Sequence, residues 1–185
     1  MKLAQFEAAF AAFCLRGPCE RQRLGSTEDV GQFSSVTKES LDKIRSDATE
    51  LLNMLKLVQP SQAEVGSFDI DRVLYALYLE RILLRYEIEY NEASDLDQMP
   101  IAAERIGDSI FTLLVNDDRS PQKRAIDLVT RVADIPRFIA ECSALLGRSI
   151  ERWVDVEIQS VEGLPALLDT AQLFLDSETP EHSAE

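Results

Sequence analysis

The residue types that most often do chemistry in enzymes are scarce in this chain of 185 residues. It has one histidine, His182, so a mononuclear zinc site, a di-iron site built on Glu-x-x-His pairs and a histidine-dependent catalytic triad all lack essential members. No P-loop and no G-x-G-x-x-G motif is present, which excludes the usual glycine-rich phosphate cradles. We therefore expect no catalytic residue, no metal ligand and no cofactor, and a protein that is not an enzyme on its own.

A second group of residues could line a cleft or form a partner surface. All four tyrosines lie in one segment, and a phenol with an apolar body and a polar tip suits a cleft wall and, more often, the edge of a core. Two arginines lie in the same segment, and a glutamate on the apolar side of the last predicted helix could pair with one of them or line a cleft. The candidate residues are Tyr75, Tyr78, Tyr86, Tyr90, Arg81, Arg85, Glu157 and Trp153.

Most of these candidates depend on a helix predicted from Ser67 to Tyr90, the most apolar long segment of the chain. At about 100° per residue, its apolar side chains fall on two nearly opposite stripes. One stripe runs from Ile70 to Ile88 through Leu77, and the other contains Leu79. A helix that is apolar on two sides needs neighbours on two sides. We therefore predict an all-α fold, a multi-helix bundle of about six helices around a central, buried helix at 67–90.

Amphipathic patterns predict the other helices of the bundle. They cover residues 3–16, 37–58, 100–115, 121–146 and 149–176. In the fourth of these, the expected buried positions are Ala125, Leu128, Val132, Ile139, Cys142 and Leu146. Because proline lacks the N–H and clashes with the preceding turn, we expect a kink or break at Pro136, and a second kink at Gly163. Residues 17–35 are expected to form an irregular connection. We predict one helical domain over 1–176 and a disordered, acidic tail over 177–185.

Composition narrows the classes of partner and the compartment. The formal net charge of -14 repels nucleic-acid phosphates, so we expect no nucleic acid as a partner. Nothing approaches the run of about 18 apolar residues that a membrane span needs, so we expect no membrane partner. The apolar run at the N-terminus is broken by Gln5 and Glu7, which is typical of an amphipathic helix rather than a signal peptide. Three cysteines without framework spacing indicate free thiols and a cytoplasmic location.

The order of segments resembles the N-terminal helical part of a bacterial family known as domain of unknown function 885. The resemblance is carried by FDIDRVLYALYLERILLRYEIEY and by DSIFTLLVNDDRSPQKRAIDLVTRVADIPRFIAECSALL, where Arg131 is followed by Ile135-Pro136 and Phe138, and then by Trp153. Members of that family look like zinc metallopeptidases built almost wholly of helices, with an HExxH helix in the C-terminal half. This sequence contains no HExxH, so the resemblance implies the scaffold of such an enzyme without its metal.

Three functions are consistent with these observations. The first is a non-catalytic helical domain, related to that scaffold, which contacts a protein or peptide partner. The second is a half-enzyme that becomes a zinc peptidase only with a separate chain carrying HExxH. The third is a helical bundle that binds a small ligand at its tyrosine-rich helix. A homodimer also fits the sequence, which identifies neither the substrate nor the partner.

Overall fold

The computed structural model describes residues 1–60, 65–87, 89–90, 93–94, 100–115, 117–147 and 149–178. For residues 86, 87, 89, 90, 93 and 94 only the backbone is described. This part of the chain forms the helices α1 (Leu3–Cys14), α2 (Pro18–Arg23), α3 (Lys38–Lys56), α4 (Val65–Glu87), α6 (Ala102–Val115), α7 (Pro121–Leu145) and α8 (Glu151–Glu178). The strands β1 (Glu89–Tyr90) and β2 (Ala93–Ser94) form a short antiparallel pair. The predicted all-α, multi-helix fold is confirmed.

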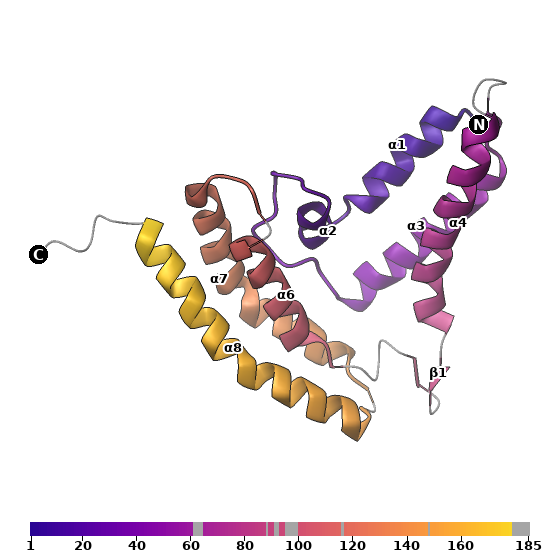
Figure 1. Cartoon of the computed structure of the whole chain (residues 1–185). Coiled ribbons are helices and arrows are strands. Elements are labelled where there is room, and N and C mark those ends of the chain that lie inside the picture. The colour runs from indigo at the N-terminus through magenta and orange to yellow at the C-terminus, as the bar shows by residue number, and fades with distance from the viewer. Residues whose placement is uncertain are drawn as a thin grey trace, which may run out of the picture.

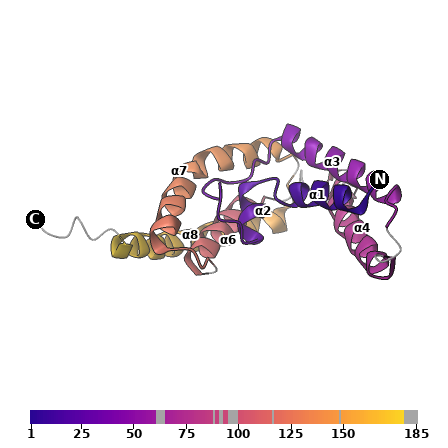
Figure 2. The ribbon, with the colours of Figure 1, turned by 90° about the horizontal axis from the view of Figure 1, so that it is seen from above.

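The helices are arranged in two lobes (Figure 1). Helices α1, α3 and α4 form the N-terminal lobe, and α6, α7 and α8 form the C-terminal lobe; α2 lies between them (Figure 2). Each lobe has its own hydrophobic cluster of buried residues. These are Phe6, Phe13, Ala48, Leu51, Leu55, Phe68 and Leu79 in the first, and Phe33, Val36, Ile106, Ile110, Leu113, Leu128, Phe138, Cys142 and Ala171 in the second. The prediction of one domain over 1–176 stays a prediction.

Helix α4 is not the centre of the bundle, so this part of the prediction is wrong. Its Phe68 and Leu79 are buried against α1 and α3. On the opposite side, five large apolar side chains are between 50 and 67% exposed: Ile70, Val73, Leu74, Leu77 and Leu84. We call these five residues the outer face of α4. The two stripes exist as the helical period indicated, but among the described residues only one of them has neighbours.

The other predicted helices are present, with boundaries that local chemistry explains. Helix α3 begins after Thr37, whose side-chain oxygen accepts a hydrogen bond from the Ser40 N–H at 3.2 Å. Helix α7 begins at Pro121, where the missing proline N–H costs nothing. Pro136 lies inside α7, which bends in Figure 2 but continues without a break to Leu145. Helix α8 likewise continues through Gly163 and Pro165.

The buried side of α7 differs from the predicted one. Ala125, Leu128 and Cys142 are buried as expected, but Val132 and Ile139 are exposed. Their places are taken by the neighbouring residues Arg131 and Phe138. The stacked rings of Phe138 and Phe33, 4.4 Å apart between centroids, show why the helix turns this side inward. Of the predicted tail, Ser177 and Glu178 belong to α8, and residues 179–185 lie outside the described residues.

Candidate functional site

Residues 24–36, which we call the connecting segment, follow α2 and pack against α7. Arg131 is the largest fully buried side chain and donates hydrogen bonds to the Val30 carbonyl and to Gln22 Oε1, the latter at 3.3 Å. Its guanidinium also lies 5.1 Å from the centroid of the Phe33 ring. Because burial removes the guanidinium from water, the pKa of Arg131 is lowered. A buried cation of α7 thus holds the connecting segment and α2 in place.

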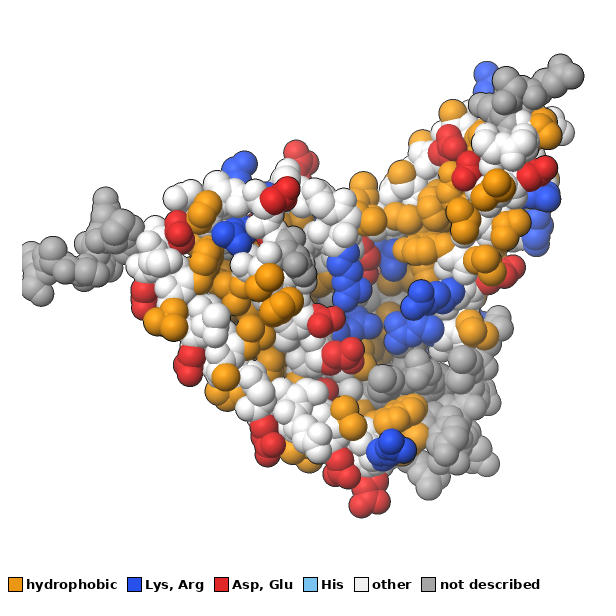
Figure 3. Space-filling model, viewed as in Figure 1, with side chains coloured by type: hydrophobic (Ala, Val, Ile, Leu, Met, Phe, Trp, Pro, Cys, Tyr) orange, Lys and Arg blue, Asp and Glu red, His pale blue; other side chains and the backbone are white. Residues whose placement is uncertain are grey.

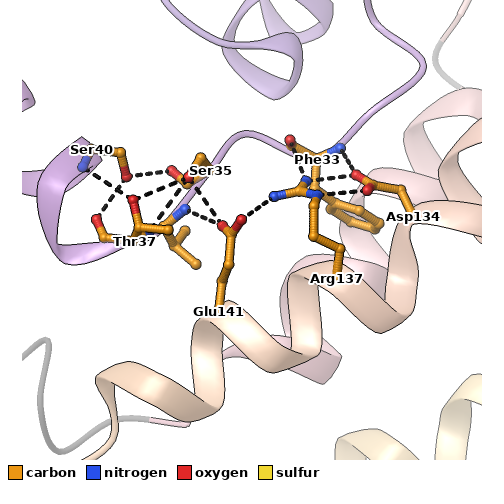
Figure 4. Close-up of polar contacts among 8 residues, drawn as sticks. Phe33, Ser35, Thr37, Ser40, Asp134, Arg137 and Glu141 are labelled. Atoms are coloured by element: carbon orange, nitrogen blue, oxygen red, sulfur yellow. Dashed lines mark hydrogen bonds and ion pairs between the residues drawn. The ribbon is translucent and has the colours of Figure 1, made fainter.

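A second group of polar contacts fixes the end of the connecting segment (Figure 4). The Phe33 N–H donates to Asp134 Oδ2 at 2.9 Å, and the Val36 N–H donates to Glu141 Oε2 at 2.9 Å. Arg137 lies between the two carboxylates, with nitrogen–oxygen distances of 2.6 Å to Asp134 and 2.5 Å to Glu141. Its Nη2 also donates to the Phe33 carbonyl at 3.0 Å. Both backbone groups of Phe33 are therefore bonded to side chains of one helix turn.

Gly31 lies where the connecting segment approaches α7 closely. A Cβ atom on Gly31 would lie 2.8 Å from Asp127 Oδ1 and 3.3 Å from the Thr130 Cβ. The first of these distances is shorter than real contacts allow, so a larger residue here would have to displace the Asp127 carboxylate or the segment itself. The irregular connection predicted over 17–35 is thus an ordered element that begins with the short helix α2.

A cleft with a volume of about 690 Å³ opens between this segment and the N-terminal lobe. Its walls come from α3, α4, α6 and α7, together with α2 and the connecting segment. Among the described residues, six cationic side chains line it: Arg16, Arg21, Lys43, Arg85, Arg105 and Arg137. Blue Lys and Arg side chains gather in the hollow between the lobes in Figure 3. In a chain with a net charge of -14, this is a local excess of positive charge.

The predicted tyrosine group is only partly brought together. Tyr75 packs edge-on against Phe6, with ring centroids 5.1 Å apart, and its hydroxyl donates to Glu7 at 3.4 Å. Burial and the negative charge of Glu7 raise the pKa of Tyr75. Tyr78 lies edge-on against Phe10 and is 40% exposed. These two rings form the edge of the N-terminal core; the side chains of Tyr86 and Tyr90 lie outside the described residues.

The other four predicted residues have different environments. Arg81 is exposed on α4, Arg85 lines the cleft, and Trp153 is half-buried near the start of α8. Glu157 has a different role from the two that were predicted. Its Oε1 accepts a hydrogen bond of 2.7 Å from the Ala103 N–H, so it satisfies a free donor at the N-terminus of α6.

Of the six cleft cations, Arg85 was a predicted candidate and the other five, Arg21 and Arg105 among them, were not. Burial and the nearby positive charge of Arg85 lower the pKa of Arg105. Nothing in the sequence places Arg105 and Arg21 in the walls of one cleft, because the two come from helices far apart in the chain. The signal that could have revealed α2 is Pro18 at the first helical position with Glu20 in the first turn.

In the part of the chain that the structure describes, no three His, Cys, Asp or Glu residues come together so as to hold a metal ion. None of the described helices is long and apolar enough to cross a bilayer. Compared with protein-family models, with curated proteins and with solved structures, the chain matches none of them. The resemblance to the domain of unknown function 885 family therefore stays a prediction.

Proposed function

We propose that the protein is a non-catalytic helical binding module, related to the scaffold that the resemblance implies, whose partner is a helix of another protein. The observation that carries the proposal is the outer face of α4. Burying the exposed half of each of its five side chains is worth roughly 1 kcal/mol per residue, or about 5 kcal/mol in total. Exposing these apolar side chains to water is unfavourable, so a partner that covers them gains binding energy.

The shape of the stripe favours a helix as the partner. From Ile70 to Leu84 it follows one side of α4 for about 21 Å, at the rise of about 1.5 Å per residue. A narrow apolar stripe at spacings of three and four is the surface that a second amphipathic helix covers. Arg81 lies exposed within this stripe, so the partner helix should present a carboxylate to it.

Charge argues against a second copy of this chain as the partner. By the helical period, exposed Asp69 and Glu80 share one flank of the stripe. If two copies of α4 paired antiparallel, this acidic flank would meet itself; if they paired parallel, Arg81 would meet Arg81. Like charges oppose each other in either arrangement. The proposed partner is therefore a different protein, and the three free cysteines support a cytoplasmic setting for the pair.

The test starts with Leu77, at the middle of the outer face. A photo-crosslinking amino acid at this position should capture a partner in cells, and the purified partner should then bind the wild-type chain in calorimetry. Leu77→Glu should weaken that binding by about 100-fold, because it places an uncompensated charge in an apolar interface. Leu173→Glu is the matched control, since Leu173 is also an exposed leucine, 71% accessible on α8.

Two outcomes would contradict the proposal. One is equal loss of binding in Leu77→Glu and Leu173→Glu, which would place the contact elsewhere. The other is a wild-type dimer by light scattering that Leu77→Glu converts to a monomer, which would make a second copy the occupant. A wild-type monomer that binds a dye for apolar surfaces, with reduced dye binding in Leu77→Ser, is the result we expect.

A further inference from the structure

The six cations of the inter-lobe cleft are not equally neutralised. Lys43 is paired with Asp47 at 3.0 Å, and Arg16 lies 3.7 Å from Glu20. Arg137 has its two carboxylates on α7, as described above. For these three cations the protein supplies its own counter-charge, and they shape the cleft wall.

Arg21 and Arg105 differ from this group. Neither side chain has a hydrogen bond or an ion pair to any residue that the structure describes. The Arg21 Nε is buried with no hydrogen-bond partner, and Arg105 is partly buried close to the like charge of Arg85. The negative charge of Glu20 offsets part of this repulsion, but Glu20 forms its ion pair with Arg16. A guanidinium removed from water without a direct ion pair destabilises the fold. An anion bound in the cleft would accept hydrogen bonds from these guanidinium groups and offset the repulsion between Arg85 and Arg105.

We propose that the inter-lobe cleft binds a small organic phosphate, with its phosphate group held by Arg21 and Arg105. Arginine suits a phosphate because its planar guanidinium offers two parallel N–H donors to two oxygens of the anion. A dianionic phosphate matches two such groups better than a single carboxylate does. This site is separate from the outer face of α4 and does not depend on the proposed partner.

The rest of the cleft indicates an apolar body on the ligand. Beside the cations, the walls contain the side chains of Phe33, Leu41, Ile44 and Ile82. The volume of about 690 Å³ lies in the range of sites that bury a ligand of metabolite or drug size. An inorganic phosphate would leave these apolar walls uncovered, so a phosphomonoester with an apolar group should bind more tightly.

The experiment uses phenyl phosphate as the probe, titrated into the full chain by calorimetry at low ionic strength. Inorganic phosphate and benzoate are compared with it, to separate the contributions of the apolar ring and of the anion. We expect saturable binding of phenyl phosphate, weaker binding of inorganic phosphate and still weaker binding of benzoate. Arg21→Met and Arg105→Met should each weaken phenyl phosphate binding by about 10- to 100-fold, as expected for the loss of a charged hydrogen bond.

Arg152→Met is the control because it makes the same change in net charge at an exposed position of α8. Its affinity for phenyl phosphate should equal that of the wild type. Circular dichroism checks that each variant is folded, and we expect Arg105→Met to be at least as heat-stable as the wild type without ligand, since it removes an unpaired, repelled cation. Arg105→Lys, which keeps the charge but loses the paired donors, should lie between wild type and Arg105→Met in affinity.

Three results would overturn the proposal. The first is no saturable binding of phenyl phosphate by the wild type below about 10 mM. The second is equal weakening in Arg152→Met, which would make the effect one of net charge. The third is tighter binding of benzoate than of phenyl phosphate, which would assign the cleft to carboxylates instead.

Discussion

Replacing Arg131 should release the connecting segment from α7. Its guanidinium is the buried donor to the Val30 carbonyl and also contacts Gln22 and the Phe33 ring. Arg131→Met keeps most of the aliphatic volume but removes these donors. Arg131→Ala removes the volume as well. The pair of variants therefore separates the contribution of the hydrogen bonds from that of packing.

The expected magnitudes follow from the burial of the side chain, which is 0% exposed. A buried carbonyl that loses its donor costs about 1–3 kcal/mol. Removing a buried charge that has no ion pair is itself favourable and offsets part of this cost. We therefore expect Arg131→Met to lose about 1–2 kcal/mol of unfolding free energy. The cavity in Arg131→Ala adds about 2 kcal/mol or more, giving about 4 kcal/mol in total. The second loss is large against the roughly 5–15 kcal/mol that a domain has.

Urea unfolding followed by circular dichroism measures these losses, with the exposed Arg152→Met as the control for charge. Hydrogen exchange adds a local readout, because the amides of Phe33 and Val36 are bonded to α7 side chains. Both amides should exchange faster in Arg131→Met than in the control. Wild-type stability in Arg131→Met, together with unchanged exchange at the two amides, would show that the guanidinium does not hold the segment.

Two further predictions concern carboxylates. Hydrogen bonds from Arg137 lower the pKa of Asp134 from its ordinary value of 3.8. The ionised Asp134 therefore stabilises the fold above pH 3.8, and this stabilisation is lost as the pH falls through the lowered pKa. The urea midpoint of the wild type should therefore drop more steeply between about pH 4 and pH 2 than that of Asp134→Asn, and parallel curves would contradict this. Glu157→Ala should lose about 1 kcal/mol of unfolding free energy. Glu157→Gln should lose less, because its amide oxygen can still accept the hydrogen bond from the Ala103 N–H. Equal stability of both variants and the wild type would refute the capping role.

Helix α4 shows what the helical periodicity of a sequence can predict about burial and what it cannot. The period correctly indicated two opposite apolar stripes, and the stripe with Leu79 is buried. The helical period does not determine whether the second stripe is covered by another helix of this chain or by a different protein. Among the described residues no helix covers Leu77, so the helix predicted as the centre lies at an edge of the molecule. The pattern determines which sides are apolar, and only tertiary packing determines which of them is covered.

In helix α7 the prediction of the buried residues was partly wrong, for a different reason. Counting apolar residues selects Val132 and Ile139, whereas the structure buries Arg131 and Phe138. An arginine can occupy a core position when acceptors meet its donors, and here the acceptor is the carbonyl of Val30, 101 residues away. No local rule contains that information. The same holds for the cleft, whose cations come from helices distant in sequence.

The connecting segment has a consequence for how the protein is made. Residues 33–36 bond to side chains that lie 101 to 106 positions later in the chain. At synthesis rates of about 5–20 residues per second, those partners follow about 5–20 s after the segment itself. The helices of the N-terminal lobe precede them and can already pack, while Phe33 has no binding place on α7. For these seconds the growing chain exposes apolar side chains to solvent and to chaperones.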